Sequence, residues 1–210
     1  MIRMPRPAGR RAAVSLALVA LTGSLAGCPA VIPALMVGGI GTAAYVANDR
    51  RTSDTVLADE RIERTINTRI KNELGTDARV NVNAFNRIVL LSGEVKDEKV
   101  KEQAEYVARM VDGTRGIHNE LAIMGLRPPR EQFSDGTVTT QVKARMVGNG
   151  VFNPLHVQAS TDGGVVYLQG LVTQAEADAA TKIAATTQGV RKVVRLFEIL
   201  PDNAPQVTNR

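Results

Sequence analysis

The chain has little of what catalytic and metal sites are usually built from. Its 210 residues include one cysteine, two histidines and no tryptophan, and aromatic residues make up 3%. His118 and His156 have no second ligand at metal spacing, which favours structural roles over a metal site. So few aromatics leave no base-stacking platform for single-stranded nucleic acid. No nucleophile elbow, phosphate-binding loop or dinucleotide fingerprint occurs, so we expect neither catalysis nor a cofactor.

The first 27 residues have the pattern of a secretion signal. The first eleven contain four arginines and no acidic residue, and an apolar run follows at 12–21. That run is too short to span a bilayer well. The exit, Leu25-Ala26-Gly27-Cys28, resembles the lipobox of bacterial lipoproteins. The resemblance implies that the signal is cut before Cys28, whose thiol takes a diacylglycerol and whose new amine is acylated.

The solitary Cys28 supports this interpretation. The alternative is a chance free thiol, but a single cysteine cannot form an internal disulfide, and an exposed free thiol is unusual in an exported protein. Two or three acyl chains would make a lasting anchor, because each buried methylene contributes about 0.8 kcal/mol. The covalent lipid on Cys28 is thus the only non-protein group that we expect.

Residues 28–58 are interpreted as a lipidated N-terminus and tether. The stretch 29–47 is apolar and rich in glycine and alanine, and 48–58 is polar. A second membrane helix is an alternative for 29–47, although its glycines favour a tether lying on or near the bilayer surface.

The basic charge of the chain is largely a property of the signal. The whole sequence has 26 basic and 21 acidic residues. Removing the signal takes away four arginines and no acid, which leaves 22 against 21, a net charge of +1. A nucleic-acid partner therefore loses its main support.

From residue 59 the chain repeats itself, with an offset of 76 or 77 residues. Each copy begins with apolar residues at i, i+4 and i+8, which predicts one face of a helix. Two alternating stretches follow, and Asp162-Gly163 between those of the second copy predicts a tight hairpin. The positions that we expect in the cores are Ile62, Ile66, Val89 and Leu91 in the first copy, and Val138, Val142, Val166 and Leu168 in the second.

A second helix and a last strand complete each copy. The helices are predicted at 97–112 and 174–188, and the strands at 116–124 and 192–200. The fold class is therefore α+β: two tandem α-β-β-α-β domains, each a small mixed three-stranded sheet packed against two helices. The predicted division is domain one at 59–125, a linker at 126–132, domain two at 133–200 and a C-terminal tail at 201–210.

This arrangement resembles the BON domain (bacterial OsmY and nodulation). The likeness rests on the apolar helix face, the Val-x-Leu-x-Gly-x-Val strand at 89–95 and 166–172, and the closing Gly-Val-Arg-Lys-Val-Val at 189–194. With a lipobox in front, the chain resembles dual BON-domain outer-membrane lipoproteins. The resemblance implies a protein on the periplasmic face of the outer membrane that binds anionic phospholipid and supports envelope integrity. Pro29 after the cysteine, where an aspartate would favour inner-membrane retention, favours the outer membrane.

The candidate lipid-binding residues lie in the second copy, which has five acids and six bases against twelve and eleven in the first. On its first helix Val147 falls far from the core stripe, near Lys143 and Ala144, where the first copy is polar and charged. The alternative is that Val147 packs against the loop of Val151 and Phe152. The set predicted to contact lipid is Thr137, Lys143, Ala144, Arg145, Val147 and Val151. Some members of the family carry a membrane-inserting aromatic where Thr137 stands.

Two functions follow from these expectations. The first is a lipid-anchored module that binds anionic phospholipid through its second domain. The alternative is a scaffold that binds an envelope component, such as the machinery that assembles outer-membrane proteins or a division component.

Overall fold

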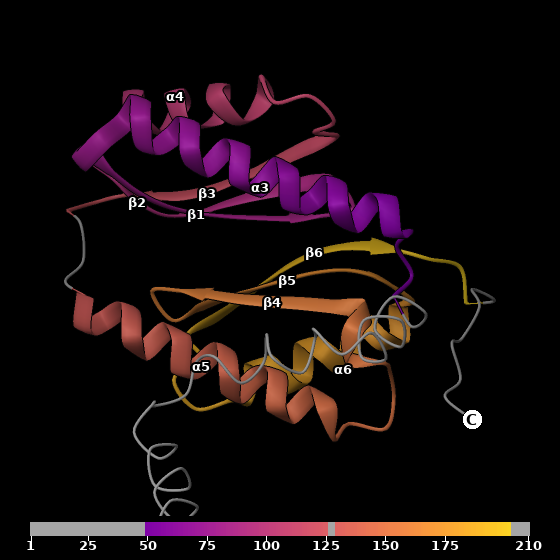
Figure 1. Ribbon diagram of the computed structural model, residues 1–210. Coiled ribbons are helices and arrows are strands. Elements are labelled where there is room, and N and C mark those ends of the chain that lie inside the picture. The colour runs from indigo at the N-terminus through magenta and orange to yellow at the C-terminus, as the bar shows by residue number, and fades with distance from the viewer. Residues whose placement is uncertain (1–48, 126–128, 203–210) are drawn as a thin grey trace, which may run out of the picture. The chain divides into compact units, whose positions relative to one another are not determined.

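The computed structural model describes residues 49–125 and 129–202, which form two successive α-β-β-α-β domains (Figure 1). Both lie within one compact unit of the chain. This confirms the predicted fold class and order of elements. The first domain consists of α3 (Ser53–Leu74), β1 (Ala78–Phe85), β2 (Ile88–Val95), α4 (Glu98–Arg109) and β3 (Gly116–Ile123). The second consists of α5 (Pro129–Val147), β4 (Val157–Asp162), β5 (Val165–Val172), α6 (Gln174–Ala185) and β6 (Lys192–Ile199).

Each sheet has three strands with the hairpin's second strand in the centre. The orders are β1-β2-β3 and β4-β5-β6. The first two strands pair antiparallel and the last two parallel, with Val89 opposite Ile117 and Val166 opposite Val193. The helices α4 and α6 form the crossovers that parallel pairing requires.

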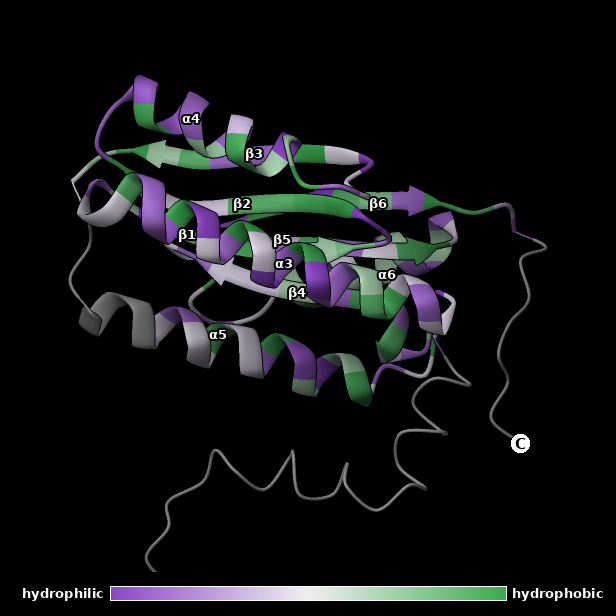
Figure 2. Ribbon diagram, turned by 45° about the horizontal axis from the view of Figure 1, so that its top comes forward, coloured by the Kyte–Doolittle hydropathy of each residue, from purple (hydrophilic) through white to green (hydrophobic). Residues whose placement is uncertain are grey.

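The apolar faces of the helices pack on one side of each sheet. All eight core positions predicted from the repeat are buried. In Figure 2 the central strand β2 is hydrophobic along most of its length, as expected for a strand covered on both faces. Two separate clusters result, one around Ile66, Val89 and Leu91 and the other around Val142, Val166 and Leu168.

A buried aspartate on the first helix of each domain holds the hairpin turn. Asp59 accepts hydrogen bonds from the backbone N–H groups of Asn86 and Arg87 at 2.9 and 2.6 Å. Asp135 accepts the equivalent pair from residues 163 and 164, both at 2.8 Å. All four turn residues have positive φ, as a type I′ turn demands. Asp59 and Asp135 are 76 residues apart, which is the offset of the repeat. The repeat could therefore have identified them, but they were not among the predicted residues.

The glycine of the repeated strand motif is required by a close backbone contact. A Cβ atom on Gly93 would lie 2.0 Å from the carbonyl oxygen of Arg79, and one on Gly170 would lie 2.3 Å from that of His156. Gly93 also has a φ of 125°, which side chains disfavour. The motif therefore contains glycine because the two hairpin strands approach closely at this position.

Two helices begin earlier than the sequence analysis predicts. The predicted tether extends to residue 58, but α3 begins at Ser53, because the side chain of Thr52 caps its first turn. The range 126–132 was interpreted as linker, but α5 begins at Pro129. A proline fits the first turn of a helix, where its missing N–H would have no intrahelical partner.

The faces of the two sheets that carry no helices cover each other. Leu90 and Tyr167 are buried, yet neither belongs to the helix-facing core of its own domain. Because successive strand residues point to opposite faces, both lie on the sides turned away from the helices. Gln169 Nε2 donates to the carbonyl oxygen of Ile88 in the other domain at 3.2 Å. Figure 1 shows the sheets adjacent and the helices outside.

Candidate functional site

The last turn of α5 carries an exposed apolar surface next to a cation. Val147 is 72% exposed and Val151, in the following loop, is 57% exposed. Lys143 and Ala144 are exposed on the same stretch of helix, and the end of α5 is green, hence hydrophobic, in Figure 2. We call Lys143, Ala144, Val147 and Val151 the α5 patch. The alternative that Val147 packs against the loop is wrong, since most of its side chain faces solvent.

The loop after α5 is organised by Asn149. Its Oδ1 accepts hydrogen bonds from the backbone N–H groups of Val151 and Phe152 at 2.6 and 2.9 Å, and its Nδ2 donates to the Phe152 carbonyl oxygen at 3.2 Å and to that of Met146. This geometry buries Phe152 and leaves Val151 outside. The sequence analysis missed Asn149, although Gly148-Asn149-Gly150 is a typical turn sequence.

Arg145 and Thr137 do not belong to the α5 patch. The guanidinium of Arg145 donates to the carbonyl oxygen of Ile183 at 2.9 Å and to the hydroxyls of Thr187 and Thr186 at 2.6 and 3.0 Å. It therefore binds the end of α6. Thr137 is exposed but stands ten residues before Val147, about 15 Å along the helix axis. The structure groups four of the six predicted contact residues and separates these two.

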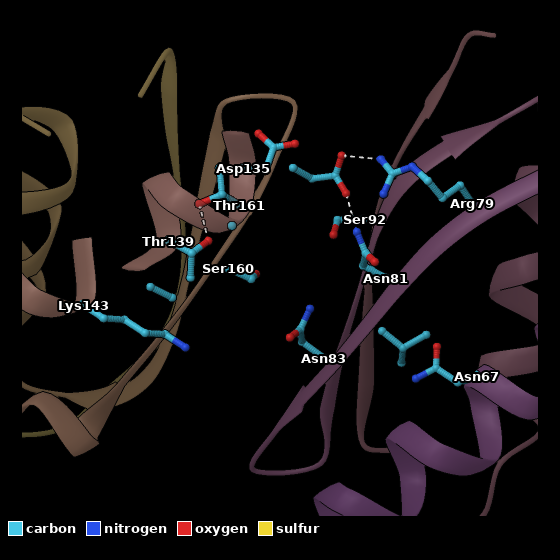
Figure 3. A pocket seen from close by; sticks show the side chains of 14 residues that line it. Asn67, Arg79, Asn81, Asn83, Ser92, Asp135, Thr139, Lys143, Ser160 and Thr161 are labelled. Atoms are coloured by element: carbon cyan, nitrogen blue, oxygen red, sulfur yellow. Dashed lines mark hydrogen bonds and ion pairs between the residues drawn. The ribbon is translucent and has the colours of Figure 1, made fainter. Parts of the chain in front are cut away.

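Lys143 lies between two cavities at the boundary of the domains. The first, of about 440 Å³, is polar and is shown in Figure 3, where Lys143 extends toward the side that carries Asn83. The second, of about 320 Å³, has polar and apolar surface in similar amounts and is lined by Lys143 and Asn83 together with Phe85, Met146, Val147 and Leu155. Within the described part of the chain, Lys143 has no ion-pair or hydrogen-bond partner.

Arg79 bridges the domains beside the polar cavity. Its Nε donates to Glu94 at 2.5 Å and its Nη2 to Asp162 of the second domain at 2.9 Å. Asn81 donates to the same Asp162 at 2.6 Å. Burial lowers the pKa of Arg79, but the hydrogen bonds that it donates to both carboxylates outweigh this effect, so the pKa lies above its ordinary value. The charges on this part of the interface are therefore compensated.

Arg50, which precedes the first domain, binds the second. It donates to both carboxylate oxygens of Glu176, at 2.7 and 3.1 Å, and to the carbonyl oxygen of Leu171 at 2.8 Å. The two side chains are 7% and 3% exposed. Burial raises the pKa of Glu176, but the hydrogen bonds from Arg50 and from the backbone N–H of Thr173 outweigh it and hold the pKa below its ordinary value.

Arg51 binds the first domain. Its guanidinium pairs with Asp49 and Asp59, at 2.8 and 2.9 Å, and lies 4.0 Å from the centroid of the Phe85 ring. Burial lowers the pKa of Arg51, but the two carboxylates raise it by more, so the pKa lies above its ordinary value. The two adjacent arginines thus fix the segment before α3 to both domains. The sequence analysis places both in the tether and gives them no role.

The described residues contain no recognisable metal site. No three His, Cys, Asp or Glu side chains in 49–125 and 129–202 are grouped to hold an ion. His118 lies in β3, and His156 lies in the 3-10 turn Pro154–His156 before β4. His156 is buried, with Nδ1 3.8 Å from Glu176. In the same ranges, no helix is both long and apolar enough to cross a bilayer.

Comparison with known families matches the BON domain twice, at residues 58–125 and 134–201. The chain belongs to the BON-domain family. It is 35% identical over 185 residues to the outer membrane lipoprotein DolP of Haemophilus influenzae, covering 87% of this chain and 94% of that protein. It is 32% identical over 152 residues to the 21 kDa hemolysin of Actinobacillus pleuropneumoniae, covering 71% and 78%. Neither name is that of an enzyme.

These relatives confirm the predicted class, a dual BON-domain lipoprotein of the outer membrane. Cys28 lies outside the described residues, so its acylation stays a prediction. Among solved structures, the C-terminal domain of CdsD, a structural protein of the Chlamydia trachomatis type III secretion system, matches at 14% identity with a TM-score of 0.29, covering 70% of this chain and 98% of that one. A likeness this low supports no functional inference.

Proposed function

We propose that the protein is held at the periplasmic face of the outer membrane by acyl chains on Cys28, binds anionic phospholipid through its second BON domain and supports envelope integrity. The covalent lipid is its only non-protein group in this proposal, and we assign it no catalytic activity and no nucleic-acid partner. The relative named DolP supports the outer-membrane placement. The lipid-binding part of the proposal rests on the α5 patch.

The observation that carries the proposal is the exposure of Val147 beside Lys143. An apolar side chain next to an unpaired cation suits the boundary between headgroups and acyl chains. The equivalent face of α3 in the first domain presents Asn67, Thr68 and Lys71. A weak site is sufficient, because a tether raises the local concentration of the domain at the membrane.

Vesicle co-sedimentation tests the proposal. We would use the mature chain with Cys28→Ala, which cannot be acylated, and vesicles of zwitterionic lipid with increasing phosphatidylglycerol. Recovery with the vesicles should rise with the anionic fraction and fall with salt, since each cation near such a surface contributes about 1 kcal/mol. An absence of binding at every composition would contradict the proposed function.

Two substitutions locate the contact within that experiment. Val147→Glu should weaken binding, because it places an anion in the apolar part of the α5 patch, and it should leave the fold intact, because Val147 is exposed. Lys71→Glu, at an exposed position of α3, should have little effect. Equal losses in both variants, or none in either while binding persists, would place the contact elsewhere.

The anchor is tested separately in cells. Cys28→Ala in the full chain should abolish incorporation of labelled fatty acid and release the protein from membranes into the soluble envelope fraction. Unchanged acylation and membrane retention would show that another residue carries the lipid. Vesicle binding by the unacylated chain does not depend on this result.

A second candidate is a scaffold that binds an envelope protein, such as the outer-membrane protein-assembly machinery. Tyr106 and Met110, one helical turn apart at the end of α4, are 62% and 52% exposed. Exposed aromatic and methionine side chains are enriched at protein interfaces. A scaffold alone predicts no vesicle binding by the unacylated chain, so the co-sedimentation experiment separates the two functions.

A further inference from the structure

The α5 patch adjoins a partly apolar cavity that the first domain helps to form. Of the side chains around this cavity of about 320 Å³, Lys143, Val147 and Leu155 come from the second domain, while Asn83 and Phe85 come from β1 of the first. A surface made only by α5 would need nothing from the first domain. The cavity therefore has two walls, one from each domain.

The chemistry of the two walls differs from that of the neighbouring polar cavity. Phe85, Met146, Val147 and Leu155 offer apolar surface. Arg51 also reaches the cavity, but its charge is compensated by the two aspartates that it binds. Lys143 is thus the cation at this cavity for which the described residues supply no counter-charge. A cavity that combines apolar surface with one uncompensated cation is complementary to an anionic amphiphile.

The segment before α3 keeps the two walls together. Arg51 contacts Phe85 on the first-domain wall, and its neighbour Arg50 forms the buried ion pair with Glu176 of the second domain. A buried, bidentate arginine–carboxylate pair has a defined geometry. The cavity is thus bounded by residues whose relative position is set by specific contacts rather than by a single exposed helix.

We propose that this two-domain cavity binds anionic phospholipid, with Lys143 pairing with the headgroup and the apolar walls covering the adjoining part of an acyl chain. The inference rests on the proposed lipid binding and adds that the first domain supplies one wall of the site. It predicts that a substitution on β1, outside the second domain, alters lipid binding.

Asn83 provides the test, because it is half-buried and lines the cavity from the first domain. Figure 3 shows Lys143 extending toward the side on which Asn83 lies. Asn83→Glu would place a carboxylate where it competes with the headgroup for Lys143. Asn67→Glu is the matched control, because it makes the same charge change in the same domain at a residue that lines only other cavities. Asn83→Gln keeps the charge and serves as the conservative variant.

The measurement is the affinity of the Cys28→Ala mature chain for phosphatidylglycerol-containing vesicles, with thermal unfolding of each variant as the folding control. Asn83→Glu should bind about fivefold more weakly, the effect of removing one cation from an anionic surface. Asn67→Glu and Asn83→Gln should stay within about twofold of the parent, as expected if only the local charge matters. If Asn83→Glu binds like the parent, or Asn67→Glu loses as much, the two-domain site is wrong while α5 binding stands. If the parent itself does not bind, the proposed function fails as well.

Discussion

The two BON domains share a framework and differ in what they place around it. In both, an aspartate on the first helix holds the hairpin turn, and a glycine lets the two hairpin strands approach closely. On the sheet face that carries no helices, the first domain has Glu94 and Arg79. The equivalent positions of the second domain are Leu171 and His156. The first helix of the first domain ends in polar side chains, whereas that of the second ends in the α5 patch. The repeat thus preserves the contacts that form each domain, and the divergence is concentrated at the interface and the exposed helix end.

The strongest asymmetry between the domains is the Arg50–Glu176 ion pair, for which the described residues of the first domain show no counterpart. Arg50→Gln should lower the free energy of unfolding by about 3–5 kcal/mol, because it leaves a buried carboxylate without its cation. Equilibrium urea unfolding would measure this loss. Arg64→Gln, which removes an exposed ion pair on α3, should cost about 0.5 kcal/mol or less. Similar losses in the two variants would mean that Arg50 is not structurally important.

The strand glycines test how closely the domains match. Gly93→Ala should destabilise the first domain by about 3 kcal/mol, since its Cβ would overlap a backbone carbonyl and its φ is unfavourable for a side chain. Gly170→Ala should cost less, because only the overlap applies there. Thermal unfolding of both variants would compare them. If either variant were as stable as the parent, the hairpin strands could move apart at that glycine without loss of stability.

The turn-holding aspartates should be less costly to replace. Asp135→Asn should lower stability by about 2 kcal/mol, because an amide keeps only part of the charge-assisted bonding to the two turn N–H groups. Asp59→Asn should cost more, since Asp59 also pairs with Arg51. Chemical denaturation of the two variants gives the order. The opposite order would mean that the Arg51 pair contributes nothing to stability.

The smallest effect that we expect is a difference in acid sensitivity. The pKa of Glu176 lies below its ordinary value of 4.5, so its contribution is present above that pH and is lost as the pH falls through the lower folded-state value. Burial raises the pKa of Glu63 on α3. The hydrogen bond that Glu63 accepts from the backbone N–H of Ala84 lowers the pKa by less, so the net pKa is raised. Its charged form is therefore disfavoured, and it contributes stability at low pH that is lost as the pH rises through the raised value.

Unfolding free energies measured between about pH 7 and pH 3 would separate these opposite signs. Glu176→Gln should flatten the loss of stability toward acid pH. Glu63→Gln should steepen it, because it removes the group that opposes the loss. If neither variant changes the slope, other carboxylates control the acid sensitivity.

Much of the fold could be predicted because the chain is duplicated. A helix face such as Ile62 and Ile66 and its copy at Val138 and Val142 support each other, so a pattern that is weak in one copy becomes reliable in two. The starts of α3 and α5 were missed because a capping threonine and a first-turn proline extend helices into sequence that is otherwise polar. The candidate site was predicted in part: Val147 follows from helical periodicity, whereas the hydrogen bonds of Arg145 to α6 do not.

The family, the order of elements and the helix-facing cores could be predicted because each depends on residue types at fixed short spacings. How the domains meet could not be predicted in this way. The partners of Arg50 and Arg79 lie 126 and 83 residues away, and no periodicity links such positions. Asn83 and Lys143 are likewise far apart along the chain. They share a cavity only because the two sheets bury against each other the faces that carry no helices.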